Sequence, residues 1–243
     1  MEKIRLSKLM SEQGLCSRRE ADSYIEQGLV FVDGERISEL GTRILPTQKI
    51  TLAEGARVQQ QARVTILLHK PVGYVSGQAE DGYKPAITLI TAGNRSPDDQ
   101  SPLRFSPAQL RGLAPAGRLD IDSTGLLVLT QDGRIAKMLI GDNSKIEKEY
   151  LVRVEGKLTD QGMRLLNHGL SLDGQALKPA KVSWQNEDQL RFVLREGKKR
   201  QIRRMFDAVG LSVTNLKRIR INNMKLPDIP AGEYKLVSRK EIL

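Results

Sequence analysis

The fold is decided by residues 117–133, which read Gly117-Arg118-Leu119-Asp120-Ile121-Asp122-Ser123-Thr124-Gly125-Leu126-Leu127-Val128-Leu129-Thr130-Gln131-Asp132-Gly133. The apolar run at 126–129 lies between turn residues, a pattern typical of a buried strand. Asp120 therefore lies on a loop just before a core strand, and rigid strands often position chemically active loop residues. A simpler interpretation stays open, in which Asp120 is an exposed turn residue or the partner of Arg118.

The overall composition predicts a folded protein with a polyanionic partner. The chain has 243 residues, of which 39 are Lys or Arg and 29 are Asp or Glu, so its net charge is +10. This balance favours nucleic acid as the partner. The sequence contains neither a basic amphipathic anchor nor a long apolar span, so a membrane partner is not expected.

The cysteine and histidine content argues against metal and disulfide chemistry. Cys16 is the one cysteine, and the two histidines are His69 and His168. These residues are too few for a structural zinc site, and no intramolecular disulfide can form. We expect no metal, structural roles for both histidines, and a reducing, cytoplasmic compartment without a signal peptide.

The first part of the chain predicts a small helical and hairpin module. Leu6, Leu9 and Met10 follow helical spacing, and Ser17-Arg18-Arg19-Glu20 is a capping box that opens a second helix. Asp33-Gly34 is a two-residue turn between strands at 29–32 and 35–37, and a further strand follows at 49–52. The cations outside the apolar positions suit a phosphate backbone; they are Arg5, Lys8, Arg18 and Arg19.

The remaining segments alternate between regular elements and two irregular stretches. Residues 53–63 are polar without an apolar stripe and are predicted to be a linker. Residues 91–113 are rich in Pro, Ser and Asp and are predicted to be a surface excursion that is disordered or orders on a partner. Strands are predicted at 64–68, 148–154, 180–184, 189–194 and 212–221, and helices at 134–139 and from Thr159.

The segment Glu196–Gly210 predicts a helix with an unfavourable start. Ile202, Met205 and Phe206 follow helical spacing, but the first turn is crowded with cations. The helix dipole is positive at that end, so the arrangement costs stability unless an anion lies nearby. RNA phosphate and a buried carboxylate are the two candidate anions. The cations concerned are Lys198, Lys199, Arg200, Arg203 and Arg204.

Taken together, these pieces resemble two known modules. Residues 5–34 resemble the alpha-L RNA-binding domain. The rest resembles the ribosomal RNA pseudouridine synthase family that carries such a domain, because four stretches match in order: Lys70-Pro71-Val72-Gly73, Gly117-Arg118-Leu119-Asp120, Lys148-Glu149-Tyr150, and Arg200-Gln201-Ile202-Arg203-Arg204-Met205. The chain departs from the family at His69, Gln131 and Lys199, of which Lys199 alters a position beside the RNA-binding helix.

The resemblance implies an α+β fold with two domains. Residues 1–58 would form the RNA-binding domain, and residues 63–243 a mixed α/β catalytic domain on a mainly antiparallel sheet with a central cleft. The implied reaction is the isomerisation of uridine to pseudouridine, without a cofactor, in ribosomal RNA. The stretch 145–150 and the basic helix are more similar to the members that act on 23S rRNA of the large subunit. The 16S rRNA and a tRNA stem-loop stay open as substrates.

The resemblance also implies roles for single residues. Asp120 matches the essential aspartate, Tyr150 the tyrosine that packs on the target base, and Arg203 the basic partner of the aspartate. A guanidinium would keep the carboxylate charged in a partly closed pocket, so Arg203 is predicted within hydrogen-bond reach of Asp120, with Arg118 as the alternative partner. Asp122 is predicted to be a turn or helix-cap residue. Further RNA contacts are predicted at Lys70, Arg118, Lys148, Lys198, Lys199, Arg200 and Arg204.

Two other classes of function remain as alternatives. A non-catalytic RNA-binding factor in ribosome assembly would use the same basic surface, but it would have no need for an acid in a basic cleft. An RNA N-glycosylase would stop after cleavage of the glycosidic bond. The target base must leave its stack to be reached, so looped or single-stranded RNA is expected. No coiled-coil seam is present, which favours a monomer.

Overall fold

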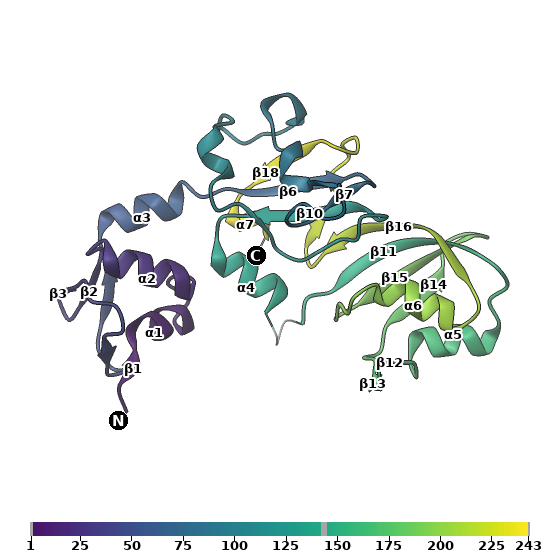
Figure 1. The fold of residues 1–243 in the computed structure, drawn as a ribbon, viewed down its shortest axis with the longest axis horizontal. Helices are drawn as coiled ribbons and strands as arrows, with labels where there is room; N and C mark the ends of the chain where they lie inside the picture. Colours follow the sequence, from purple (N-terminus) through teal and green to yellow (C-terminus); the bar gives the residue numbers. More distant parts are fainter. Residues whose placement is uncertain (1, 142–144, 243) are drawn as a thin grey trace.

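The computed structural model describes residues 2–141 and 145–242. An N-terminal domain and a larger sheet domain are joined by helix α3 (Glu54–Gln61), as Figure 1 shows. The N-terminal domain contains α1 (Leu6–Glu12), α2 (Arg18–Glu26), β1 (Ile4–Arg5), β2 (Val30–Val32), β3 (Glu35–Ile37), β4 (Arg43–Ile44) and β5 (Ile50–Leu52).

Local sequence signals determine the N-terminal domain. Ser17 Oγ accepts a hydrogen bond from the backbone of Glu20, whose carboxylate accepts one from the Ser17 amide, so the predicted capping box is confirmed. Asp33 and Gly34 both have positive φ angles, 48° and 87°, as a tight hairpin turn between β2 and β3 requires. Buried Leu6, Met10, Tyr24, Ile25 and Val30 belong to its core.

The segment predicted to be a linker does join the domains, but it is helical. In α3 one residue, Ala56, is buried, so no apolar stripe could reveal the helix. Arg and Gln are good helix formers, and Glu54 in the first turn complements the helix dipole. A polar helix of this kind is stable as a bridge between two packed domains.

The larger domain is organised around a twisted sheet with the strand order β14-β15-β11-β16-β10-β6-β18. All neighbours in this order pair antiparallel except β10 and β16, which run parallel. The expected mainly antiparallel sheet is therefore confirmed. The strands are β6 (Thr65–Lys70), β10 (Thr124–Thr130), β11 (Lys148–Glu155), β14 (Lys181–Trp184), β15 (Gln189–Leu194), β16 (Ser212–Ile221) and β18 (Tyr234–Val237).

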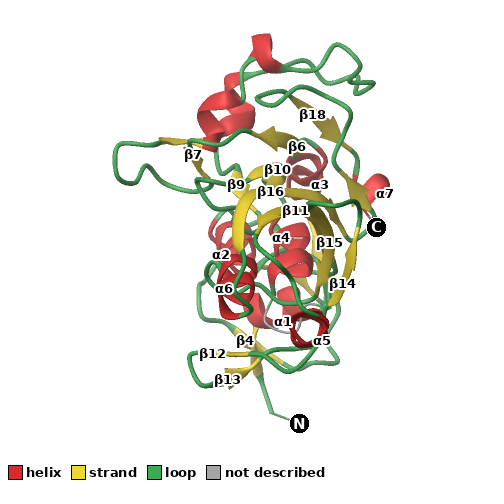
Figure 2. Ribbon diagram, turned by 90° about the vertical axis from the view of Figure 1, so that its right-hand side faces the viewer, coloured by secondary structure: helices red, strands yellow, loops and turns green. Residues whose placement is uncertain are grey.

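Helices pack against the sheet, as Figure 2 shows, and two separate cores place them on both of its faces. Helices α5 (Asp160–Asn167) and α6 (Gln201–Ala208) pack on one face around Phe192 and Phe206. Helices α4 (Gly133–Ile140) and α7 (Arg239–Ile242) pack on the opposite face. Strand β10 is buried on both faces, since Leu127 and Leu129 lie in one core and Leu126 and Val128 in the other. This explains its continuous apolar run.

Short elements complete the domain, most of them in connections between strands. They are β7 (Tyr74–Val75), β8 (Lys84–Pro85), β9 (Ala114–Pro115), β12 (Ser171–Leu172), β13 (Gln175–Ala176), β17 (Met224–Lys225) and the 3-10 turns η1 (Ala86–Leu89), η2 (Ala92–Asn94) and η3 (Pro107–Leu110). None of the helices in the described part of the chain has the length and apolar character needed to cross a membrane.

The excursion at residues 91–113 has a defined structure without a partner, so the expectation of disorder was wrong. Arg95 forms an ion pair with Asp99 at 2.7 Å, and Phe105 and Leu110 pack against the main core. Ser106 caps η3. These interactions offset the polar composition that suggested disorder.

The N-terminal domain rests on the first turn of α4. Arg134 Nη1 donates to the Leu15 carbonyl at 3.4 Å, and the Gly133 amide donates to the Glu20 carboxylate at 3.5 Å. Glu20 is also ion-paired with Arg63 at the end of the linker. A Cβ at Gly133 would lie 2.4 Å from Ser17 Cβ, so only glycine allows the two domains to approach this closely.

Candidate active site

The loop that carries Asp120 is held by the backbone and by one buried serine. Ser76 Oγ donates to the Leu119 carbonyl at 2.7 Å and accepts from the Leu119 amide at 2.8 Å. The Gly73 amide donates to the Ile121 carbonyl at 2.8 Å, which ties the Lys-Pro-Val-Gly turn to this loop. Asp120 is half-buried, and its carboxylate makes neither a hydrogen bond nor an ion pair with any described residue. The acid is therefore free to meet a ligand.

Lys70 supports the Asp120 loop through hydrogen bonds to backbone carbonyls. Its side chain is fully buried, and Nζ donates to the carbonyls of Ser123 at 2.8 Å and Pro71 at 2.9 Å. Burial lowers the pKa of Lys70 to about 8, and the nearby charges of Asp120 and Asp122 offset only part of this effect. The prediction that Lys70 contacts RNA was wrong, because a side chain without exposed surface cannot reach a phosphate.

Arg218 on β16 is the second buried cation of the site. Its side chain is 2% exposed; Nε donates to the Leu126 carbonyl at 2.8 Å and Nη1 to the Arg118 carbonyl at 3.0 Å. These two acceptors lie on either side of Asp120 in the sequence. Gly125 lies opposite Arg218, and a Cβ there would be 2.2 Å from the Arg218 carbonyl oxygen. The glycine therefore allows β10 and β16 to meet at the active-site loop.

Tyr150 joins the same group from β11. It pairs with Arg218 across the antiparallel ladder, and its hydroxyl lies 3.5 Å from Arg218 Nη1. Its side chain is 8% exposed. Lys148 precedes it by two residues. Burial lowers the pKa of Lys148, and the positive charge of Arg218 lowers it further. The sheet register thus brings the predicted acid and tyrosine to one site.

Arg203 does not bind Asp120 in this structure, which corrects the predicted pairing. Its Nη2 lies 3.3 Å from the Asp122 carboxylate and donates to the Asp122 carbonyl at 3.0 Å. Arg200 binds the same carboxylate through Nη2 at 2.9 Å. Burial alone would raise the pKa of Asp122, but these two guanidinium groups lower it. Arg118 is no substitute, since its side chain is 77% exposed and reaches Glu80.

Asp122 thus supplies a carboxylate at the basic start of α6. The sequence left open whether RNA phosphate or a carboxylate would be the anion that offsets the cations at the start of this helix. In the free protein the carboxylate does so for Arg200 and Arg203. Asp122 was expected to be only a turn or cap residue, because nothing in the sequence shows that α6 lies beside the 117–123 loop.

The other predicted RNA contacts are accessible to different degrees. Most are exposed; these are Arg5, Lys8, Arg18, Arg19, Arg118, Lys199 and Arg200. Three are half-buried, namely Lys148, Lys198 and Arg204. Arg204 is ion-paired with Asp173 at 2.6 Å, so contact with RNA would have to compete with that pair. Their roles in RNA binding stay predictions.

Arg218 was missed by sequence reasoning, although a signal was present. In the strand Ser212–Ile221, Arg218 follows Leu216 by two residues, so both are expected on the same inward face. A cation at an inward strand position is rarely buried without a functional or structural reason.

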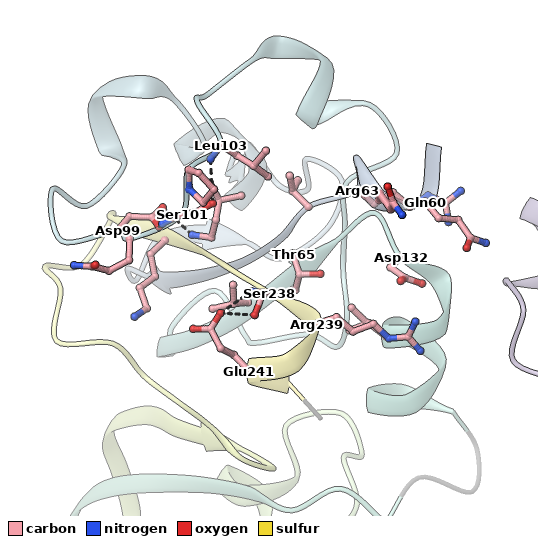
Figure 3. Close-up of a pocket in the computed structure, with 18 of the residues that line it drawn as sticks. Gln60, Arg63, Thr65, Asp99, Ser101, Leu103, Asp132, Ser238, Arg239 and Glu241 are labelled. Atoms are coloured by element: carbon pink, nitrogen blue, oxygen red, sulfur yellow. Dashed lines mark hydrogen bonds between the residues drawn. The ribbon is translucent and has the colours of Figure 1, made fainter. Parts of the chain in front are cut away.

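A separate cavity of about 720 Å³ lies at the other end of β6 (Figure 3). It is bounded by the linker helix, the 99–103 loop and the β18–α7 region. Thr65, at the start of β6, lines it, whereas Lys70 at the end of that strand belongs to the Asp120 site. The cavity therefore lies where the linker helix meets the catalytic domain and does not belong to the candidate active site.

Comparison with known proteins identifies the chemistry. Residues 64–208, more than half of the chain, match the family of RNA pseudouridylate synthases. The chain belongs to this family. The pseudouridine synthase also contains an S4 domain, matched over residues 4–50. Its activity is therefore the isomerisation of uridine to pseudouridine in RNA.

Several relatives resemble the synthase over nearly its full length. The dual-specificity RNA pseudouridine synthase RluF of Shigella flexneri is 37% identical over 243 residues, which cover 99% of this chain and 77% of the relative. The ribosomal large subunit pseudouridine synthase B of Bacillus subtilis is 31% identical, and the match covers 98% of this chain and 94% of the relative. A crystal structure of a pseudouridylate synthase superposes with a TM-score of 0.66 at 26% identity, covering 98% of both chains.

Proposed function

We propose that this synthase modifies one uridine of 23S rRNA in the large ribosomal subunit. The basic S4 domain, the net charge of +10 and the similarity to a large-subunit enzyme support this substrate. The proposal includes a monomeric enzyme in the cytoplasm. The single cysteine and the RNA substrate support the compartment, and the lack of a coiled-coil seam in the sequence supports the monomer.

The observation that carries the proposed mechanism is the free carboxylate of Asp120 beside two buried cations. In the reaction the N1–C1′ bond of the target nucleotide breaks, the uracil turns, and C5 bonds to C1′. The proton on C5 leaves, and N1 takes up a proton. Positive charge builds on the ribose when the first bond breaks, and the Asp120 carboxylate is the group that stabilises it. Lys70 holds the loop that presents this carboxylate.

Tyr150 is proposed as the contact for the flipped base. An aromatic face can stack on uracil without reading its hydrogen-bonding edge. Because most of this residue is buried, the base can contact only its small exposed part. Extrusion of the base favours a loop or a single strand as the target.

Pseudouridine mapping tests the substrate. Total rRNA and tRNA from cells lacking the gene are treated with carbodiimide and read by reverse transcription, then compared with RNA from cells carrying the wild-type or Asp120→Ala protein. We expect one 23S position whose stop is lost without the gene and returns only with the wild type. A stop in 16S rRNA instead would refute the large-subunit assignment.

A tRNA stem-loop is a second candidate, because the relative at 37% identity is named as a dual-specificity enzyme. The same mapping covers tRNA. A site in tRNA besides the one in rRNA would establish dual specificity, and a tRNA site alone would replace the rRNA proposal.

A further inference from the structure

Arg218 has an unusual electrostatic position compared with the half-buried arginines. Arg63, Arg95 and Arg134 are each paired with a carboxylate, respectively Glu20, Asp99 and Asp132. Arg218 is more deeply buried than any of these. Yet no carboxylate oxygen of the described residues lies within 4.0 Å of its guanidinium nitrogens, the distance that defines an ion pair. A buried charge without a counter-charge is costly, so packing alone would favour an apolar residue here.

The hydrogen bonds of Arg218 are also incomplete. Nε and Nη1 bind the carbonyls of Leu126 and Arg118, but Nη2 is buried without a partner in the described structure. An unsatisfied buried donor destabilises the folded state, because it has lost its hydrogen bonds to water without replacement. Unmet donors and unpaired charges are tolerated mainly where they serve function.

The contacts that Arg218 does make converge on the reaction site. Its guanidinium carbon lies 5.9 Å from the centre of the Tyr150 ring, and Nη1 is shared between the tyrosine hydroxyl and the Arg118 carbonyl. One planar group therefore links the loop before Asp120, the strand after it, and the tyrosine. Lysine could not do this, because it lacks a fork of fixed donors.

We propose that Arg218 is a positioning residue of the pseudouridine synthase, which fixes the Tyr150 hydroxyl relative to the Asp120 loop through its forked guanidinium. The proposal rests on the role of Tyr150 at the target base. Arg218 is not expected to touch RNA phosphate, since its side chain has almost no exposed surface. It acts on the rate of conversion and not on RNA affinity.

The test uses total RNA labelled with [5-³H]uridine from cells that lack the gene, so the wild-type rate is measurable whichever RNA is the substrate. Tritium is released when C5 exchanges its hydrogen for the bond to C1′. Arg218→Met should lower the single-turnover rate by about 10²-fold, the order expected for misplaced reacting groups, with RNA affinity within threefold. An unchanged rate, or an equal loss in affinity and rate, would overturn the proposal.

Arg220→Met is the matched control on the same strand. Arg220 is half-buried, but it pairs with Glu147 and Glu149 instead of the site residues. This variant should keep the wild-type rate within about threefold, on the scale of a substitution away from the reacting groups. If it slowed the reaction as much as Arg218→Met, the effect would be a general one of strand stability, and the positioning role would be refuted.

Two further variants separate the proposed role from misfolding and test whether Arg218 acts through Tyr150. Arg218→Lys keeps the charge at the buried position, and we expect about tenfold slower conversion because it can hold only part of the network. A wild-type rate for the lysine variant would overturn the role of the fork. Arg218→Met should cost much less in the Tyr150→Phe background than in the wild type, whereas additive effects would show that Arg218 does not act through the tyrosine.

Discussion

At the scale of single residues, the active site is an acid placed among fixed cations. Lys70 and Arg218 hold backbone carbonyls on both sides of Asp120 and leave its carboxylate free. The sequence pointed to Asp120 and Tyr150 through their motifs, and their catalytic roles stay predictions. It could not show that Arg203 binds Asp122, because that contact depends on where α6 packs and not on any local pattern.

Asp120→Asn is the direct test of the acid. The amide has nearly the same shape and breaks no hydrogen bond of the described structure, so folding and RNA affinity should stay within a few-fold of wild type. Conversion should fall by roughly 10³-fold or more, because the negative charge at the ribose is lost. Tritium release and filter binding measure the two quantities. A large loss of affinity would instead assign Asp120 a structural role.

Lys70 predicts an unusual dependence of stability on pH. Its pKa is lowered from 10.5 to about 8 in the folded protein, chiefly by burial. Between these values the unfolded chain binds more protons than the folded one, so the free energy of unfolding contributed by Lys70 rises with pH. The rise reaches about 3 kcal/mol by pH 10.5.

Lys70→Met provides the comparison, since it removes the titrating group and keeps a flexible side chain. Urea unfolding at pH 7.5, 9 and 10 should show the wild type gaining stability relative to the variant as pH rises. Groups other than Lys70 are the same in both proteins, so their contributions cancel in the comparison. A difference that did not change with pH would contradict the lowered pKa.

At the scale of elements, local signals were sufficient wherever the determinants are close in sequence. The capping box at Ser17, the Asp33-Gly34 turn and the double-sided apolar run of β10 all appear in the structure as predicted. Helix α3 and the ordered 91–113 excursion were missed. Their order depends on docking between domains and on the Arg95–Asp99 pair, which composition does not reveal.

Gly125 tests the most demanding contact between elements. Gly125→Ala would place a methyl group 2.2 Å from the Arg218 carbonyl oxygen at a φ of +109°, so β10 and β16 would have to separate. We expect destabilisation by about 3 kcal/mol or more, together with loss of activity. Unfolding in urea, followed by the fluorescence of Trp184 on β14, measures the change.

Gly232→Ala is the matched control for backbone strain. Its φ is +97°, but a Cβ there would meet nothing within 4 Å. It should cost only about 1–2 kcal/mol. Equal losses in both variants would mean that the strand contact adds nothing to the strain of the positive φ.

At the scale of the whole molecule, the S4 domain packs against the catalytic domain. The S4 domain carries exposed cations, and its docking on α4 sets its direction relative to the catalytic domain. Gly133→Ala should undock it, because the new methyl group would collide with Ser17. Small-angle scattering should then show a larger radius of gyration. Ser17→Gly in the same chain should restore the wild-type value, since it removes the colliding atoms at little cost to the helix cap.

The contribution of the S4 domain to RNA binding is testable by charge. Arg18→Ser with Arg19→Ser removes two exposed cations, and we expect the slope of log affinity against log salt to fall by about 1.4–1.8 if both contact phosphate. Arg153→Ser with Lys157→Ser removes the same charge from the far end of β11 and should leave the slope unchanged. Identical slopes for both pairs would mean that the N-terminal cations do not bind the RNA.

The parallel contact between β10 and β16 also has a consequence for folding kinetics. It joins residues 124 and 125 to residues 217 and 218, whereas β10–β6 and β15–β11 connect strands closer in sequence. Contacts between residues far apart in sequence form slowly, because the entropy of closing a large loop is lost before the contact can stabilise the chain. We therefore expect the β10–β6 and β11–β15 pairs to form before β10 and β16 join. Since Asp120 precedes β10 and Tyr150 lies on β11, which pairs with β16, recovery of activity during refolding should lag behind recovery of secondary structure.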